Sequence, residues 1–184
     1  MLAYIFWHIP KEGTDPEEYE SSLTGFHAAL SNAPPEGFHA SAIFRHYALP
    51  WAPSSLFVYE DWYLVDGFAA LGILNDAAIE GRRRAAHDEA AARAAWGAGG
   101  VYRPVDGEAA SLSGGFSYWL AKPDGLGYEA FYDELGTVKQ LWRRQMVLSP
   151  APEFCLLAGS RLEVGFDVFE SSAHTVYTRF PEKP

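Results

Sequence analysis

The feature that most constrains the fold of this chain is an internal repeat. Residues 7–30 (WHIPKEGTDPEEYESSLTGFHAAL) align without a gap with residues 119–142 (WLAKPDGLGYEAFYDELGTVKQLW). Trp7 falls on Trp119 and Leu23 falls on Leu135 in this alignment. Because self-similarity over such a stretch is typical of repeated structural units, the sequence predicts two related halves in one chain.

The first half shows the pattern of a sheet with helices. Residues 2–10 alternate as a strand requires, and Asp15, Pro16 and Glu18 form the start signal of a helix. Further strands are expected at 38–49, 55–64 and 101–105, and helices at 65–74 and 77–96. The order β-α-β-β-α-β is typical of a ferredoxin-like unit.

The second half restarts the pattern after a polar linker. A strand is expected at 116–121, and three more at 153–159, 165–170 and 175–180. The helix between them should bury a stripe formed by Phe131, Leu135, Val138 and Trp142. No second helix fits before the last strand, so we expect a first half at 1–106 and a shorter second half at 113–184.

Aromatic residues determine how the two halves should pack. The chain contains 6 Trp, 10 Tyr and 12 Phe, and many of them lie in the expected strands. A ferredoxin-like sheet covers one face with helices, and an exposed aromatic second face would cost many kcal/mol at roughly 25 cal/mol per Å². The predicted fold class is therefore α+β, with two tandem ferredoxin-like halves whose antiparallel sheets pack face to face.

The doubled β-α-β-β pattern over nearly the whole chain resembles the dimeric α/β-barrel superfamily. A second point of resemblance is residues 58–88 (VYEDWYLVDGFAALGILNDAAIEGRRRAAHD), where a strand rich in acidic and aromatic residues precedes a helix and a histidine. This superfamily includes antibiotic-biosynthesis-type monooxygenases, EthD-like and NIPSNAP-like proteins and chlorite-dismutase-like haem proteins. The resemblance implies a cavity between the sheets for a small organic molecule or haem, without fixing a reaction.

Charge and composition exclude several classes of partner. A formal net charge of −10 argues against binding to nucleic acid or to an anionic membrane, which require clustered Lys and Arg. The apolar residues 2–9 are too few for a spanning helix and lack the flanks of a signal peptide. Cys155 is the one cysteine of the sequence, so no intramolecular disulfide can form. We expect a cytoplasmic protein.

Glu60 and Glu170 are the candidate acid–base residues, because they occupy equivalent places near the ends of central strands. A carboxylate that faces an aromatic cavity would be desolvated and suited to act as a general base. In the catalytic hypothesis Glu60 is the base, and Arg45 or a histidine such as His46 orients an oxyanion. The alternative is an ion pair between Glu60 and Arg45 on neighbouring strands.

The six histidines do not form a metal-binding pattern, since no two stand four residues apart. We therefore expect no metal and no cofactor. Haem needs only one axial histidine, and His174 is the candidate in the second half. It precedes a strand, however, whereas the chlorite-dismutase-like relatives place their ligand on a helix.

Other residues are candidates for ligand binding. Trp62 and Tyr118 could line a pocket, although aromatic residues in strands more often serve packing. Glu170 shares the argument for Glu60. His87 and the preceding arginines at 82–84 could rim the cavity and attract an anionic ligand, or could form a solvated, salt-bridged helix face.

These observations predict a protein that handles small molecules, such as a cofactor-independent monooxygenase or isomerase acting on an aromatic or polyketide-like compound. The alternative is a non-catalytic ligand-binding or assembly protein, with haem binding as a minor alternative. The expected partner is a small organic molecule. Whether the protein forms a homodimer is not decided by the sequence, because the tandem of two halves already supplies the pairing that single-half relatives obtain by dimerising.

Overall fold

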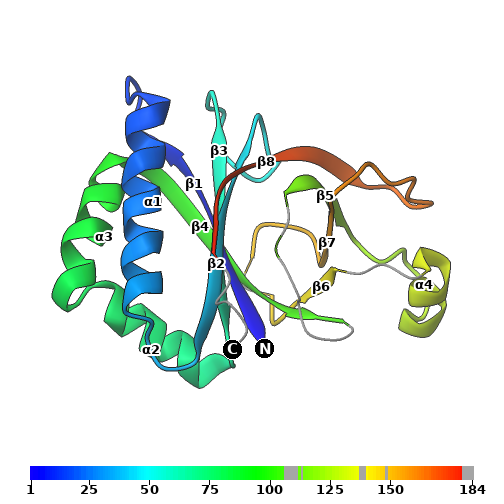
Figure 1. Cartoon of the computed structure of the whole chain (residues 1–184). Coiled ribbons are helices and arrows are strands. Elements are labelled where there is room, and N and C mark those ends of the chain that lie inside the picture. Colours follow the sequence, from blue (N-terminus) through cyan, green and yellow to red (C-terminus); the bar gives the residue numbers. More distant parts are fainter. Residues whose placement is uncertain (106–111, 113, 137–139, 148, 180–184) are drawn as a thin grey trace.

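The computed structural model describes residues 1–105, 112, 114–136, 140–147 and 149–179. Their strands form one closed antiparallel barrel in the order β1-β3-β2-β8-β5-β7-β6-β4 (Figure 1). The strands are β1 (Leu2–Pro10), β2 (Phe38–His46), β3 (Val58–Val65), β4 (Ala94–Pro104), β5 (Gly115–Leu120), β6 (Leu141–Arg144), β7 (Phe154–Ala158) and β8 (Phe169–Arg179). The helices are α1 (Pro16–Asn32), α2 (Phe68–Ala78), α3 (Gly81–Arg93) and α4 (Tyr128–Leu135).

The closed barrel shows that the expected fold class, two tandem ferredoxin-like halves with sheets packed face to face, is wrong. β2 pairs with β8, and β4 pairs with β6, so the sheet has no free edge at either junction. Edge pairing satisfies backbone N–H and C=O groups that two separate sheets would leave exposed. The proposed boundary between halves falls mostly on residues 106–111 and 113, which lie outside the described residues, so that division stays a prediction.

Several elements differ from the sequence-based expectation. The helix expected up to residue 96 ends at Arg93, and the glycine-rich segment that follows belongs to β4. α4 ends at Leu135, whereas Trp142 lies in β6, so these two residues do not share a helical stripe. Val138 lies outside the described residues. The last two expected strands are replaced by a single strand, β8.

α1 forms as its sequence predicts. The Asp15 side chain accepts hydrogen bonds from the backbone N–H groups of Glu17 and Glu18, and Pro16 occupies the first turn. The apolar stripe of the helix is buried against the barrel wall, as expected; its members are Tyr19, Leu23, Phe26 and Leu30. α1 and α3 lie side by side over the outer face of the sheet, with α2 below them (Figure 1). None of the described helices combines the length and the apolar character needed to cross a membrane.

Strand alternation divides the side chains between the barrel interior and the helix layer. Trp7 and Trp62 point into the barrel. Trp7 packs edge to face against Trp119 at 5.5 Å between ring centroids, and Trp62 packs in the same way against Trp142 at 5.2 Å. The intervening residues of the same strands point outward, beneath α1, α2 and α3. The interior is thus an aromatic core, and the helix-covered face is a separate layer.

Two glycines of β4 make room for aromatic rings of β1 in this helix-covered layer. A Cβ atom at Gly97 would collide with the Phe6 ring, and one at Gly99 would lie 2.7 Å from Tyr4 Oη. Real Cβ atoms do not approach other heavy atoms so closely, so the rings of Phe6 and Tyr4 occupy the volume that side chains on β4 would otherwise fill.

The substitution Gly97→Ala should therefore lower the free energy of unfolding by about 1–3 kcal/mol, because an added methyl group overpacks the site. Gly25→Ala is the matched control, since a Cβ there meets no atom within 4 Å and Gly25 lies inside α1. It should stabilise the protein by up to about 1 kcal/mol through helix propensity. Urea denaturation measures both, and equal effects of the two variants would refute the packing argument.

Candidate functional site

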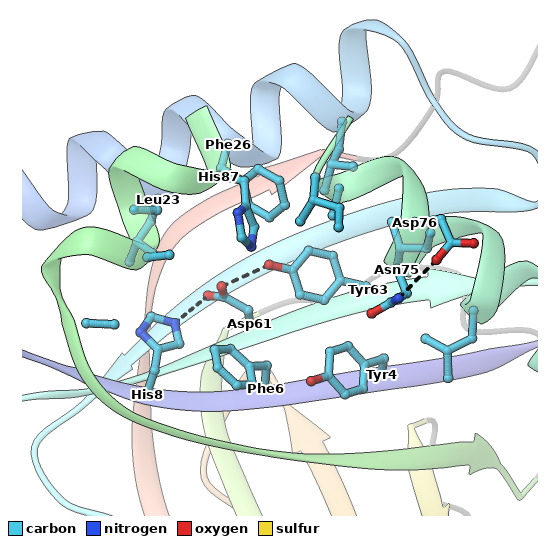
Figure 2. Close-up of a pocket in the computed structure, with 18 of the residues that line it drawn as sticks. Tyr4, Phe6, His8, Leu23, Phe26, Asp61, Tyr63, Asn75, Asp76 and His87 are labelled. Atoms are coloured by element: carbon cyan, nitrogen blue, oxygen red, sulfur yellow. Dashed lines mark hydrogen bonds and ion pairs between the residues drawn. The ribbon is translucent and has the colours of Figure 1, made fainter. Parts of the chain in front are cut away.

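A cavity of about 680 Å³ lies between the outer face of the barrel and helices α1, α2 and α3. Its floor is formed by β1 and β3, its roof by α1 and α3, and its far end by α2 (Figure 2). This volume lies within the range of small-molecule sites, about 300–1,000 Å³. The polar and aromatic lining residues are Tyr4, Phe6, His8, Tyr19, Phe26, Asp61, Tyr63, Phe68, Asn75, Asp76 and His87.

Asp61 is the centre of a polar network at the cavity floor. Its Oδ1 lies 3.2 Å from His8 Nε2, and its Oδ2 lies 3.3 Å from His27 Nε2. The Tyr63 hydroxyl donates a hydrogen bond of 3.0 Å to Oδ2 and lies 3.0 Å from His27 Nε2. Asp61 is only 3% exposed, so two histidines and one tyrosine replace its water shell.

The electrostatic environment keeps Asp61 ionised. Burial alone would raise the pKa of this carboxyl group, but the attraction of His8 and His27 outweighs it, and the pKa is lowered below the ordinary value. Burial and the nearby Asp61 charge raise the pKa of the Tyr63 hydroxyl well above its ordinary value. Tyr63 is therefore a hydrogen-bond donor that keeps its proton.

His8 connects Asp61 to a second tyrosine. Its Nδ1 lies 2.6 Å from the Tyr19 hydroxyl. Because Nε2 faces an ionised carboxylate, the ring proton belongs on Nε2, and Nδ1 then accepts the Tyr19 proton. Burial, followed by Asp61, raises the pKa of Tyr19, so the phenol stays protonated. The result is a chain Tyr19–His8–Asp61 that ends at the cavity.

The network keeps hydrogen-bonding capacity free for a ligand. Within the described part of the chain, Asp61 Oδ1 and His8 Nε2 have no aligned hydrogen-bond partner, although their mutual distance permits charge attraction. Both atoms are buried, and both residues line the cavity. An unpartnered buried polar atom is costly, so a ligand group that donates to Asp61 Oδ1 would be favoured.

Aromatic rings form the walls beside this network. Tyr4 stacks with Phe6 and with Tyr63 at 6.2 and 6.1 Å between ring centroids. Phe26 packs against His87 at 5.5 Å in the roof. At the α2 end the lining becomes polar, where Asn75 donates to Asp76, and Figure 2 shows these two residues at the far end from His8. Flat apolar walls with polar groups at both ends suit a flat organic ligand.

The structure places Glu60 inside the barrel and not in this cavity. Its carboxylate is fully buried and accepts hydrogen bonds from Trp7 Nε1 at 2.8 Å and Trp62 Nε1 at 2.7 Å. His46 Nε2 lies 3.8 Å away, so Glu60, His46 and Trp62 do come together. Arg45 points to the opposite face and pairs with Glu20 of α1 at 2.6 Å, because it is offset from Glu60 by one strand position.

The remaining candidates are spread over the molecule. His87 lines the cavity roof. Tyr118 lies in a different apolar cluster and accepts a hydrogen bond from the Leu162 backbone. Glu170 pairs with Arg161 at 3.0 Å. His174 is exposed on β8 and does not line the cavity. No group of three His, Cys, Asp or Glu side chains that could hold a metal was found among the described residues.

Sequence reasoning missed the residues of the polar network. The sequence analysis named Glu60 as the candidate base and not its neighbour Asp61. Strand alternation places these two carboxylates on opposite faces of the sheet. The signal was present: His8 and Asp61 share the face of β1 and β3 that an amphipathic helix must cover. The register of β1 against β3 could not be predicted from the sequence. It places His8 opposite Tyr59, two residues before Asp61 and on the same face of the sheet.

Comparisons with known proteins support the fold only. No protein-family model matches the chain, and no curated protein resembles it in sequence. Among solved structures, the chain is similar to a crystal structure of a putative monooxygenase from Fusobacterium nucleatum, with a TM-score of 0.62. The similarity covers 98% of this chain and 94% of the other, at 6% identity. The two proteins therefore share a fold over nearly their whole length.

Replacing Asp61 with Asn should destabilise the protein by about 3–5 kcal/mol near pH 7, because two buried histidines would lose their anionic partner. Since the folded-state pKa is lowered, the stabilisation exists above the unfolded pKa of about 4 and fades as pH falls further. The difference between wild type and variant should thus be smaller at about pH 3 than at about pH 7.

Denaturant titrations at both pH values measure this difference. Asp124→Asn is the control, because Asp124 is exposed in a turn away from the cavity and carries the same charge change. A difference for Asp61→Asn that does not depend on pH would contradict the ionised-carboxylate assignment.

Proposed function

We propose that this protein is a small-molecule enzyme that removes a proton from a flat aromatic substrate bound in the helix-covered cavity. The observation that carries the proposal is the Tyr19–His8–Asp61 chain, which ends at the aromatic walls of the cavity. A buried histidine oriented by an ionised carboxylate is a common arrangement for general-base catalysis. Asp61 and His8 are themselves buried, and the low dielectric around them strengthens this electrostatic effect.

The proton route follows from the hydrogen bonds. An acidic C–H or O–H group of the substrate gives its proton to the Tyr19 oxygen, while the Tyr19 proton moves to His8 Nδ1. The imidazolium that forms is stabilised by Asp61. The raised pKa of Tyr19 means that the phenol transmits the proton without persisting as a phenolate. His8 takes the role of base in this proposal instead of Glu60, whose carboxylate is held by two indole N–H groups inside the barrel.

The substrate anion then has two chemical outcomes. Return of the proton to a different carbon gives an isomer, and no further reactant is needed. Alternatively, the deprotonated carbon of a former CH₂ group reacts with dioxygen and gains one oxygen atom as a carbonyl, and the second oxygen leaves as water with the remaining hydrogen of that carbon and the proton held by His8. The name of the structurally similar protein, a putative monooxygenase, favours the second outcome for this chain. Neither outcome requires a bound cofactor.

Anthrone is a suitable probe, because it is a flat three-ring compound with an acidic CH₂ group that dioxygen converts to the carbonyl of anthraquinone. We expect the wild-type protein to accelerate oxygen uptake and anthraquinone formation over the spontaneous reaction. His8→Gln should reduce this rate about 100-fold or more, the typical contribution of a general base.

His174→Gln provides the matched control, since it makes the same replacement at an exposed histidine outside the cavity. Circular dichroism melting of both variants separates loss of catalysis from loss of folding. If His8→Gln retains the wild-type rate while folded, the proposed base is wrong. If anthrone binds without turnover, the non-catalytic ligand-binding alternative is favoured.

A further inference from the structure

We infer that the cavity selects a flat aromatic ligand that carries a protonated amine at the end near α2 and a hydrogen-bond donor at the inner end. This inference rests on the proposed function, because it describes the substrate class of the same cavity. It follows from the distribution of charge over the lining residues: Asp61 and Asp76 lie at its two ends, and no Lys or Arg of the described residues lines the cavity.

The inner end of the cavity accepts a donor and repels an anion. Asp61 is ionised and 3% exposed, and its Oδ1 has no hydrogen-bond partner among the described residues. Its carboxylate borders the cavity, so an incoming carboxylate or phosphate would meet a buried negative charge. A hydroxyl or N–H group would instead donate a hydrogen bond to Oδ1 and remove the free-energy cost of leaving this buried acceptor without a partner.

The outer end carries a second carboxylate. Asp76 lies on α2 at the cavity mouth, beside Asn75, whose side chain donates to it at 3.2 Å. Both residues are exposed, and no salt bridge engages Asp76 within the described residues. Phe68, 48% exposed, also lines the cavity, at the other end of α2 from Asp76. An ammonium group at this mouth would be attracted by the charge of Asp76.

The arginines expected to attract an anion do not serve this cavity. Arg83 donates to the backbone carbonyls of Ala77 and Ala33, where it holds the ends of α2 and α1. Arg84 faces Asp88 at 3.6 Å on the exposed side of α3. Neither residue lines the cavity. Arg83 therefore supports the helix layer, and none of the three arginines at 82–84 lines the cavity to attract an anionic ligand.

Three small compounds of nearly equal shape test this inference: 1-naphthylmethylamine, 1-naphthalenemethanol and 1-naphthoic acid, which are a cation, a neutral molecule and an anion near pH 7. Calorimetry or quenching of tryptophan fluorescence gives their dissociation constants with the wild-type protein. We expect the amine to bind about tenfold more tightly than the alcohol, and the acid to bind most weakly.

Asp76→Asn should reduce the advantage of the amine over the alcohol about threefold, the size expected for one exposed charge pair. Asp124→Asn, which removes the same charge from an exposed turn that does not line the cavity, should leave the ratio unchanged. Comparison at low and high salt adds a second readout, since the Asp76 contribution should weaken with screening.

The outcomes separate this inference from the proposed function. If the acid or the alcohol binds as tightly as the amine, or if Asp76→Asn leaves the ratio unchanged, the charge selection is overturned while anthrone turnover can still hold. If none of the three compounds binds and anthrone is not turned over, both the charge selection and the use of this cavity are wrong.

Discussion

The buried carboxylate of Asp61 is the interaction on which the helix-covered side of the molecule depends. Three elements converge on it or on its partners: β1 through His8, β3 through Tyr63, and α1 through Tyr19 and His27. A charge at 3% exposure is tolerated only because these groups surround it. The same contacts that compensate the charge also fix the orientation of His8, so the stability of the fold and the geometry of the candidate site depend on one network.

β3 illustrates how one strand serves two environments. Glu60 faces the barrel interior and accepts hydrogen bonds from two indole groups, while Asp61 faces the helices and binds imidazoles. Each carboxylate has partners suited to its layer, and neither layer needs the other for compensation. The strand thus carries one carboxylate in the aromatic core and one in the candidate site, separated by a single peptide bond.

Sequence patterns predicted local structure better than global closure. The start of α1 and its buried stripe followed from Asp15, Pro16 and apolar spacing, and the structure confirms them. The closed barrel could not be predicted, because β2–β8 and β4–β6 pairing joins segments far apart in sequence. The candidate site was missed for a related reason. Its members lie on β1, β3 and α1, and only strand register and helix docking bring them into contact.

The bare backbone of β4 beside the cavity has a further consequence. The rings of Phe6 and Tyr4 occupy the space that side chains at Gly97 and Gly99 would fill. The position of the cavity floor therefore depends on β4, which places no titratable side chain in the cavity. Small side chains on that strand would displace the rings of Phe6 and Tyr4, and because Phe6 stacks on His8 at 5.3 Å between ring centroids, the displacement would reach the candidate site. The dimensions of the cavity floor and the orientation of His8 are therefore coupled through Phe6, so a change in the size of the cavity that is made on β4 would also change the candidate site.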